Sequence, residues 1–266
     1  MPASTHDLPM QPQKSWFTPA VLCFLIAMLL NPLIDQPSLK AQQVSFEAEF
    51  GASWFSRNDV RIPNEEGTLF DMIDLLGSEP YPYMRLRLNL GLGERHLIRG
   101  LYAPLSQSGS GTFDEEVFFE ETTFQPGVPT EGTYRFNTYR LTYRYTFLQR
   151  SSWELGAGAA VLVRDAKVEL EQDDRSDRNT DLGFVPLIHL FAKGILSDQW
   201  SVSTDIETLA GPQGRATDGA IALNYTSGNQ FTISTGYRVI EGGADVDEVY
   251  NFAWINLGFI GVRLGL

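Results

Sequence analysis

Large apolar residues recur at every second position along most of the chain after residue 41. One such stretch runs from Met84 to Leu92, where Met84, Leu86, Leu88, Leu90 and Leu92 alternate with polar or small residues. A period of two places alternate side chains on opposite faces of a β-strand, and no stretch keeps the 3.6-residue period of a long helix. The pattern therefore predicts an all-β chain.

Ten strands follow from this periodicity. We expect them at about 44–55, 81–93, 96–105, 133–147, 152–169, 182–196, 199–208, 216–226, 230–240 and 251–266. The third and sixth alternate least clearly, and eight strands are the alternative if one hairpin is a loop. Short turns alternate with connections of about 25, 27, 12, 8 and 10 residues. Short periplasmic turns and longer extracellular loops are typical of transmembrane β-barrels, so we predict an antiparallel up-and-down barrel.

The N-terminal segment follows a different pattern. Lys14 precedes an apolar run at 21–30, and the small residue Ala41 follows after a short spacer. Ten apolar residues are about half of what a membrane-spanning helix needs. The order of basic, apolar and small residues is typical of a secretory signal peptide. We therefore expect a signal peptide at 1–41 and a barrel at 42–266, with an uncleaved anchor as the alternative.

The aromatic residues favour a lipid-embedded barrel over a soluble sandwich. The four tryptophans after residue 41 lie near strand ends with outward parity: Trp54, Trp153, Trp200 and Trp254. Four further aromatic residues are expected in the same girdles: Tyr81, Tyr83, Phe147 and Phe231. Aromatic girdles of this kind mark the two membrane interfaces of a barrel. With the signal peptide, they predict a monomer in the bacterial outer membrane, with outer-membrane lipids, lipopolysaccharide and the barrel assembly machinery as partners.

Two stretches carry a family resemblance. The last six residues, GVRLGL at 261–266, resemble the C-terminal targeting signal of outer-membrane barrels, although Leu266 stands where that signal usually has an aromatic residue. TYRFNTYRLTYRY at 133–145 and EGGADVDEVYNFAW at 241–254 resemble a group of small, uncharacterised proteobacterial-type barrels. The resemblance implies fold and location, and it implies no activity.

Composition narrows the chemistry. The chain has 33 acidic and 20 basic residues and a formal net charge of −13, which excludes a general nucleic-acid binder. A single cysteine excludes a disulfide scaffold and a cysteine-type zinc site. We expect no cofactor. The acidic stretches 114–121 and 241–248 offer carboxylates to Ca²⁺ or Mg²⁺, but their spacing matches no EF-hand loop, which leaves metal binding open.

The strand positions expected to face the lumen carry charged residues of both signs. The expected lumen network consists of Glu47, Glu49, Arg85, Arg87, Arg140, Arg144, Glu154, His189, Asp205, Glu207, Asp218, Arg238 and Arg263. A barrel of eight to ten strands is barely wide enough for its own side chains, and unpaired charges there are costly. We therefore predict an ion-pair plug in which Asp218 lies opposite Arg238. A selective path for small solutes is the alternative.

His189 is the residue that tests an enzymatic interpretation. If Leu196 pairs with Trp200 across the expected turn, counting back along both strands places His189 opposite Glu207. A histidine–carboxylate pair can act as a general base. Omptin-type proteases and outer-membrane acylhydrolases place their acidic, histidine or serine groups at the outer rim or facing lipid. His189 lies well down its strand, and no serine or second acid is clearly matched to it. The sequence favours a structural histidine, and no catalytic residue is assigned.

One loop carries an apolar stretch. Residues 69–76 are expected to form a short amphipathic helix that caps the lumen or lies at the membrane interface. Together these features predict a non-catalytic outer-membrane barrel with a structural or surface-recognition role through its extracellular loops. A narrow porin is the second hypothesis, and an outer-membrane hydrolase that uses His189 is the third.

Overall fold

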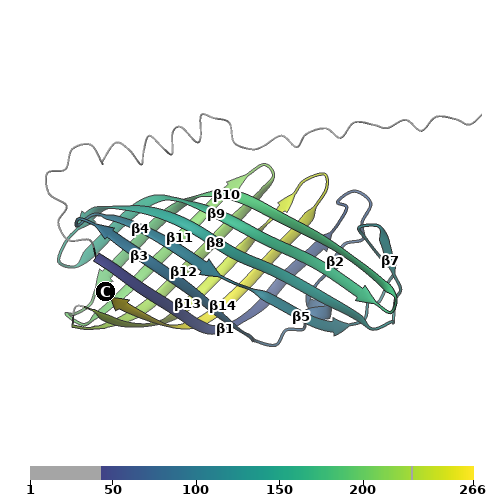
Figure 1. The fold of residues 1–266 in the computed structure, drawn as a ribbon, viewed down its shortest axis with the longest axis horizontal. Coiled ribbons are helices and arrows are strands. Elements are labelled where there is room, and N and C mark those ends of the chain that lie inside the picture. Colours follow the sequence, from purple (N-terminus) through teal and green to yellow (C-terminus); the bar gives the residue numbers. More distant parts are fainter. Residues whose placement is uncertain (1–42, 229) are drawn as a thin grey trace, which may run out of the picture. The chain divides into compact units, whose positions relative to one another are not determined.

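The computed structural model describes residues 43–228 and 230–266, so the signal peptide expected at 1–41 lies outside the described residues. The wall consists, in chain order, of β1 (Gln43–Arg61), β3 (Tyr81–Leu92), β4 (His96–Ala103) continued by β5 (Ser106–Gly111), β8 (Thr130–Gln149), β9 (Trp153–Gln172), β10 (Arg175–Ile195), β11 (Trp200–Gly211), β12 (Gly214–Ser227), β13 (Phe231–Asp245) and β14 (Tyr250–Gly265). Each strand pairs antiparallel with the next, and β14 pairs with β1 (Figure 1). The predicted ten-stranded closed barrel is confirmed.

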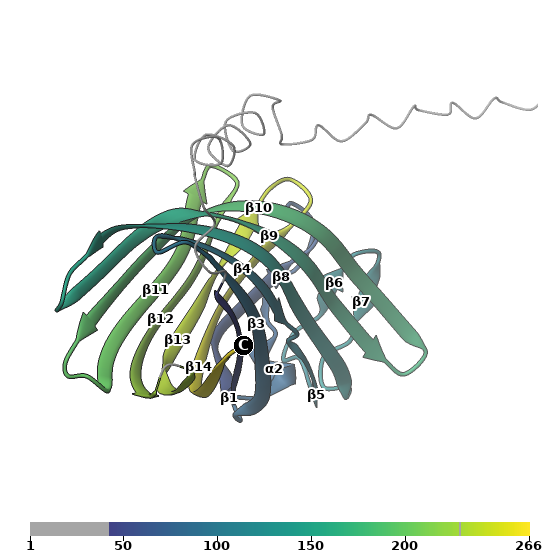
Figure 2. The same cartoon turned by 60° about the vertical axis from the view of Figure 1, so that its left-hand side comes forward.

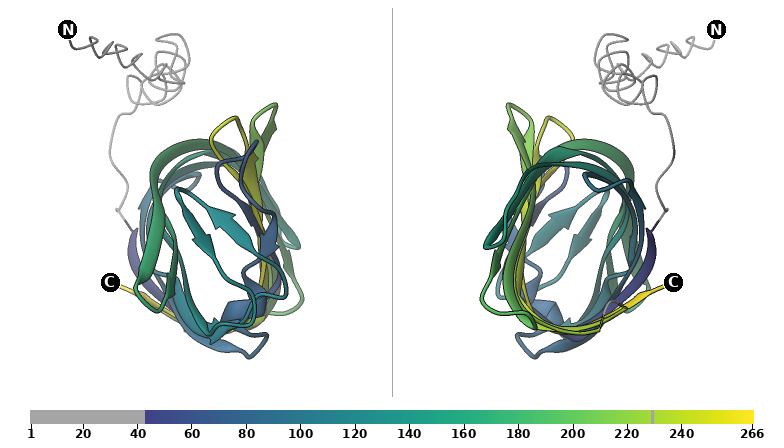
Figure 3. Two further views of the ribbon diagram at one scale, coloured as in Figure 1. Left: turned by 90° about the vertical axis from the view of Figure 1, so that its right-hand side faces the viewer. Right: turned by 90° about the vertical axis from the view of Figure 1, so that its left-hand side faces the viewer.

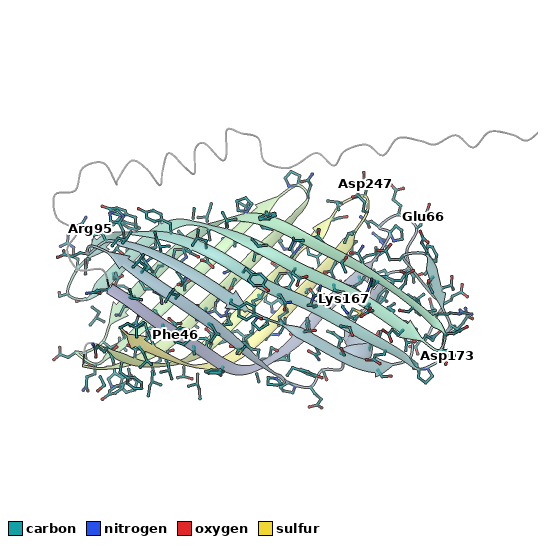
Figure 4. The ribbon with its side chains drawn as sticks, in the orientation of Figure 1. Phe46, Glu66, Arg95, Lys167, Asp173 and Asp247 are labelled. Atoms are coloured by element: carbon teal, nitrogen blue, oxygen red, sulfur yellow. The ribbon has the colours of Figure 1, made fainter. Side chains whose placement is uncertain are left out.

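The two ends of the barrel differ. The short connections from β3 to β4, β8 to β9, β10 to β11 and β12 to β13 lie at one end, which we name the turn end, and the opposite end is the loop end. Arg95 marks the turn end and Asp173 the loop end in Figure 4. The predicted lengths of about 12, 8 and 10 residues for the last three loops are wrong. In the structure these connections are only 173–174, 212–213 and 246–249. β10 continues beyond the apolar band through 175–181 and β13 through 241–245, two stretches that show no apolar alternation in the sequence.

The third wall strand is interrupted. It was expected to end at residue 105, but β5 continues it after Pro104 and Leu105 and pairs only with β8. Proline has no N–H to donate and so breaks the ladder. The backbone N–H of Phe136 still donates to Leu105 O at 2.8 Å, which keeps the strand in the wall. The sequence of β5, SQSGSG, contains no apolar residue that could have predicted it.

The outer face of the wall is apolar. Large side chains such as Leu141, Leu182 and Ile260 are 59%, 65% and 61% exposed, as a barrel in lipid requires. Trp153 and Trp200 begin β9 and β11 at the turn end, whereas Trp254 and Trp54 lie towards the loop end. The expectation for Tyr83 was wrong: its side chain is buried and its hydroxyl donates to Glu49 at 3.0 Å, so it points into the lumen.

An apolar plug fills the loop end from inside. We name it the loop plug and define it as residues 62–80 and 112–129, which carry β2 (Phe70–Asp71), α2 (Ile73–Leu76), β6 (Val117–Phe119) and β7 (Thr122–Phe124). Met72, Phe119 and Phe124 are fully buried in the core that this plug shares with the wall. Figure 3, which looks along the barrel, shows the closed ring of strands and the β6–β7 hairpin within its outline. The plug therefore packs its apolar side chains against the inner face of the wall at the loop end.

The helix expected over 69–76 is much shorter than predicted. Phe70 and Asp71 pair with β1, and α2 is a single turn that packs inside the barrel and not at the membrane interface. Within the described residues, no helix is long and apolar enough to cross a membrane.

Glycines make the seat for α2. A Cβ on Gly109 or Gly111 of β5 would collide with the backbone oxygen of Leu75 or Asp74, and one on Gly132 of β8 would lie 2.8 Å from Leu75 Cδ1. Figure 2 brings α2 and β5 into view together. Any side chain at these positions would push the helical turn off the wall.

We expect Gly109→Val to displace α2 and to destabilise the protein by about 1–3 kcal/mol, the usual cost of overpacking a core. Limited proteolysis should then cleave the loop plug faster, while the boiled and unboiled forms still migrate differently on a gel. Gly258→Val is the matched control, because a Cβ at this wall glycine meets nothing within 4 Å. Equal protease resistance of both variants would contradict the glycine seat.

Candidate functional site

The lumen below the loop plug is filled by a charge network. Glu49 of β1 is almost fully buried and accepts hydrogen bonds from three side chains. Arg87 Nη2 lies 2.8 Å and Arg238 Nη2 3.0 Å from its carboxylate, and the hydroxyl of Tyr83 also lies at 3.0 Å. Because β1 and β3 pair in register, Glu47 and Glu49 lie directly opposite Arg87 and Arg85. Glu47 accepts from Arg87 Nη1 at 2.6 Å.

Asp218 of β12 is the second buried acceptor. It lies 2.5 Å from Arg238 Nη1, 2.6 Å from Arg85 Nη2 and 2.9 Å from Arg140 Nη1. The predicted placement of Asp218 opposite Arg238 was wrong by two residues, because the ladder pairs Arg238 with Ala220. The long arginine side chain crosses this diagonal offset, so the structure brings the two charges together without a direct cross-strand pair.

The third group of contacts lies on β11. Asp205 accepts two hydrogen bonds from Arg99, at 2.7 and 3.0 Å, in the forked geometry that makes arginine–carboxylate pairs strong. Glu207 accepts from Arg99 at 3.0 Å, from Thr142 Oγ1 at 2.6 Å and from Arg140. Arg140 therefore links Glu207 to Asp218 and joins the contacts into one network.

Charge is balanced within this network. Its five carboxylates belong to Glu47, Glu49, Asp205, Glu207 and Asp218, and its five guanidiniums belong to Arg85, Arg87, Arg99, Arg140 and Arg238. Every one of them lies within an ion-pair distance of an opposite charge. Burying charges is tolerable only when each is paired and hydrogen-bonded, and this network meets that condition.

Three of the predicted members lie nearer the turn end. Arg144 Nη2 is 3.5 Å from Glu154, and its guanidinium lies 3.8 Å from the ring centre of Phe191. Gly156 leaves room for the aliphatic part of Arg144. Arg263 was expected in the network, but it is exposed and donates to Thr232 Oγ1 at 3.1 Å. No carboxylate of the described residues lies within 4.0 Å of it.

His189 lies opposite Glu207 in the β10–β11 ladder, as the sequence predicts. Its ring is fully buried, and Nδ1 lies 3.5 Å from Glu207 and 3.7 Å from Asp205, too far for a good hydrogen bond. Neither ring nitrogen has a hydrogen-bond partner among the described residues. The neighbouring carboxylates are already held by Arg99 and Arg140, so the site lacks a free base beside an open cavity.

His189, Asp205 and Glu207 are also the one grouping of metal-ligating side chains in the described residues, with one ligand atom of each within 4.8 Å of the others. Histidine nitrogen with carboxylate oxygen suits Zn²⁺ or a similar ion. The oxygens that would bind the ion accept hydrogen bonds from Arg99 instead. A divalent cation would have to displace that guanidinium, so the geometry favours the ion pairs.

The sequence did not identify Arg99 as a network residue, although it holds two carboxylates. In HLIRGLYA of β4, Leu97 and Leu101 share its inward parity, whereas His96 and Gly100 lie on the outward side. Neither face of β4 is clearly polar or apolar, so the alternation of residues could not show that Arg99 points into the lumen.

We expect Arg238→Met to lower the free energy of unfolding by about 3–5 kcal/mol, because Asp218 and Glu49 lose a buried counter-charge. Urea titration of the refolded barrel measures this loss. Adding Asp218→Asn to that variant should cost less than the sum of the single changes, and strict additivity would show that the two side chains do not interact. Arg263→Met is the control, expected to change stability by less than about 0.5 kcal/mol.

Comparison with known proteins bears on the fold. No protein-family model and no curated protein sequence matches the chain. The outer membrane protease OmpT from Escherichia coli matches with a TM-score of 0.50 at 10% identity, covering 87% of this chain and 99% of that chain. Ail, the attachment invasion locus protein of Yersinia pestis, gives 0.39 at 8% identity, covering 85% and 100%. Neisserial surface protein A gives 0.34 at 13%, covering 86% and 99%. The match to OmpT and the closed ten-stranded wall together show that the chain has the fold of an outer-membrane β-barrel.

Proposed function

We propose that the protein is a closed outer-membrane β-barrel, without catalytic activity, whose extracellular end recognises a cationic surface outside the cell. One observation carries the proposal: paired charges occupy the middle of the lumen, and the apolar loop plug packs inside the wall at the loop end. Function is therefore assigned to the outside of the molecule and not to its interior.

The location is inferred from the wall. Its apolar outer face and the tryptophans near its strand ends suit a lipid bilayer. Its fold is that of outer-membrane barrels. The turn end would face the periplasm and the loop end the outside, as in barrels with short periplasmic turns. On this proposal the partners are the barrel assembly machinery during insertion and then lipopolysaccharide and other outer-membrane lipids around a monomer.

The charge of the chain is concentrated at the loop end. The segments beyond the apolar band are 57–80, 106–137, 164–181, 209–217 and 241–251, and they contain 23 Asp and Glu but 8 Lys and Arg. The rest of the chain after residue 41 has 8 acidic and 10 basic residues. Figure 4 shows Glu66, Asp173 and Asp247 in the half of the barrel that holds the loop end. The net charge of the protein therefore comes entirely from this end.

Such a surface attracts positive partners. Summed charge of one sign raises the local concentration and the association rate of oppositely charged molecules, more strongly at low salt. It repels a polyanion unless divalent cations lie between them. A cationic protein or cell surface is therefore the class of partner that the loop end suits best.

The proposal of no catalysis depends on His189. A general base must reach a proton on a substrate, and it needs a free acceptor within about 2.6–3.2 Å of that proton's carrier. His189 is fully buried among side chains, and the two nearby carboxylates are held by arginines. Loss of a hydrolytic activity in His189→Ala would contradict this part of the proposal.

We expect the protein in planar bilayers to show no large, steady conductance, and liposomes that contain it should not swell in sugar solutions. Deletion of 68–76 should leave this unchanged, because the charge network still fills the lumen below the plug. Sugar flux through the intact protein would support the narrow porin instead. Flux that appears only after the deletion would identify the loop plug as the gate of an otherwise open barrel.

We expect the protein in neutral-lipid nanodiscs to bind polylysine, with an affinity that falls as salt rises. Asp173→Asn with Asp174→Asn, at the tip of the β9–β10 hairpin, should weaken this binding several-fold. Glu94→Gln with Asp198→Asn is the matched control, because it removes the same charge from exposed turns at the other end. An equal loss in both variants would contradict recognition through the loop end.

A further inference from the structure

A groove of about 680 Å³ lies on the outer wall face, across β3, β4, β8 and β9. Its floor is Gly100 of β4, which the ladders place between Leu88 of β3 and Leu141 of β8. One row higher, Tyr102 and Tyr139 stack with their ring centres 5.3 Å apart and form its upper end. The groove is as large as a pocket for a drug-sized ligand, about 300–1,000 Å³, and its lining is apolar.

The hollow exists because position 100 has no side chain. A Cβ at Gly100 would meet nothing within 4 Å, so neither packing nor a close backbone approach requires glycine there. The situation differs at Gly156, where a Cβ would lie 2.9 Å from Arg144. Glycine weakens the interior of a strand and often marks the close approach of a ligand. The wall at position 100 would thus accept a larger residue without rearrangement.

Polar groups lie directly above the groove. Continuing outward from Tyr139 along β8, the next two side chains of the same parity are Asn137 and Arg135. Arg135 lies opposite Lys167 in the β8–β9 ladder. Each cation shares its charge with a carboxylate: Arg135 lies 2.7 Å from Asp165, and Lys167 contacts Glu169. The groove therefore runs from the apolar band to a row of mixed charge at the upper interface.

We propose that this groove binds one acyl chain of lipopolysaccharide and that Arg135 and Lys167 contact the phosphates of its headgroup. In a lipid bilayer, van der Waals packing and polar contacts drive association with the wall. An acyl chain therefore binds most tightly where the wall has a groove that the chain can lie along. Basic side chains beside such a hollow recognise lipid headgroups. Asp165 and Glu169 suit the divalent cations that bridge those phosphates. The proposal rests on the outer-membrane orientation, and it goes beyond surface recognition by the loop end.

Native mass spectrometry of the detergent-purified protein tests the site. The probes are hexa-acylated lipid A and phosphatidylglycerol, each added at the same concentration. We expect the wild type to retain lipid A, and Gly100→Leu to lose it because leucine fills the floor. Gly258→Leu is the matched control: it is a lipid-facing glycine of β14, a Cβ there meets nothing within 4 Å, and it lies outside the groove.

A second variant separates the chain from the headgroup. Arg135→Gln with Lys167→Gln should abolish the preference for lipid A over phosphatidylglycerol while leaving the groove intact. Different migration of boiled and unboiled samples shows that every variant is folded. Equal retention of lipid A by Gly100→Leu and the wild type would overturn the site, and equal retention of both lipids by the wild type would overturn its assignment to lipopolysaccharide. Neither result depends on conductance or on polylysine binding.

Discussion

The structure depends on the pairing of charged side chains inside the barrel, most of them buried. Five guanidiniums and five carboxylates meet in one network, and Glu49, Asp218 and Glu207 each accept from at least two arginines. These contacts tie together β1, β3, β4, β8, β11, β12 and β13, strands from all around the wall. Because a lone charge in such a site is very costly, no member can change sign or vanish without affecting the others. The network therefore fixes which strands face one another across the lumen as well as closing it.

At the loop end, the interior of the barrel is occupied by apolar side chains and not by ion pairs. There the wall strands rise above the lipid band, and the residues that line the interior become Phe55, Tyr134, Leu170 and Ile255. The loop plug supplies the matching surface, and glycines of β5 and β8 let α2 approach the wall closely enough to pack. The interior is thus divided into an ion-paired level and an apolar level. On the proposed function, the accessible chemistry therefore lies on the outside of the barrel.

The outside presents two surfaces with different physical character. At the loop end, polar ladders extend the hairpins and carry a large excess of carboxylates. On the membrane-facing wall, the hollow at Gly100 ends below the mixed charges of Arg135 and Lys167. Long-range attraction is the property of the first surface, whereas short-range packing and headgroup contacts are the properties of the second. A barrel with a closed lumen can therefore have one function towards the medium and another towards its lipids.

The sequence by itself determined the barrel, the positions of the tight turns and the inward parity of most network residues, because a period of two is a local property of a strand between lipid and lumen. Only the tertiary structure decided the rest. Residues 175–181 of β10 are polar on both faces and leave no period to detect, although they pair with β9. The diagonal contact of Arg238 with Asp218 depends on the turn register and on the reach of a long side chain across the lumen. Arg99 was hidden by the mixed faces of β4, and the close packing of Leu75 against the wall depends on glycines that lie far along the chain. Each of these features arises from contacts between distant segments, which no local pattern encodes.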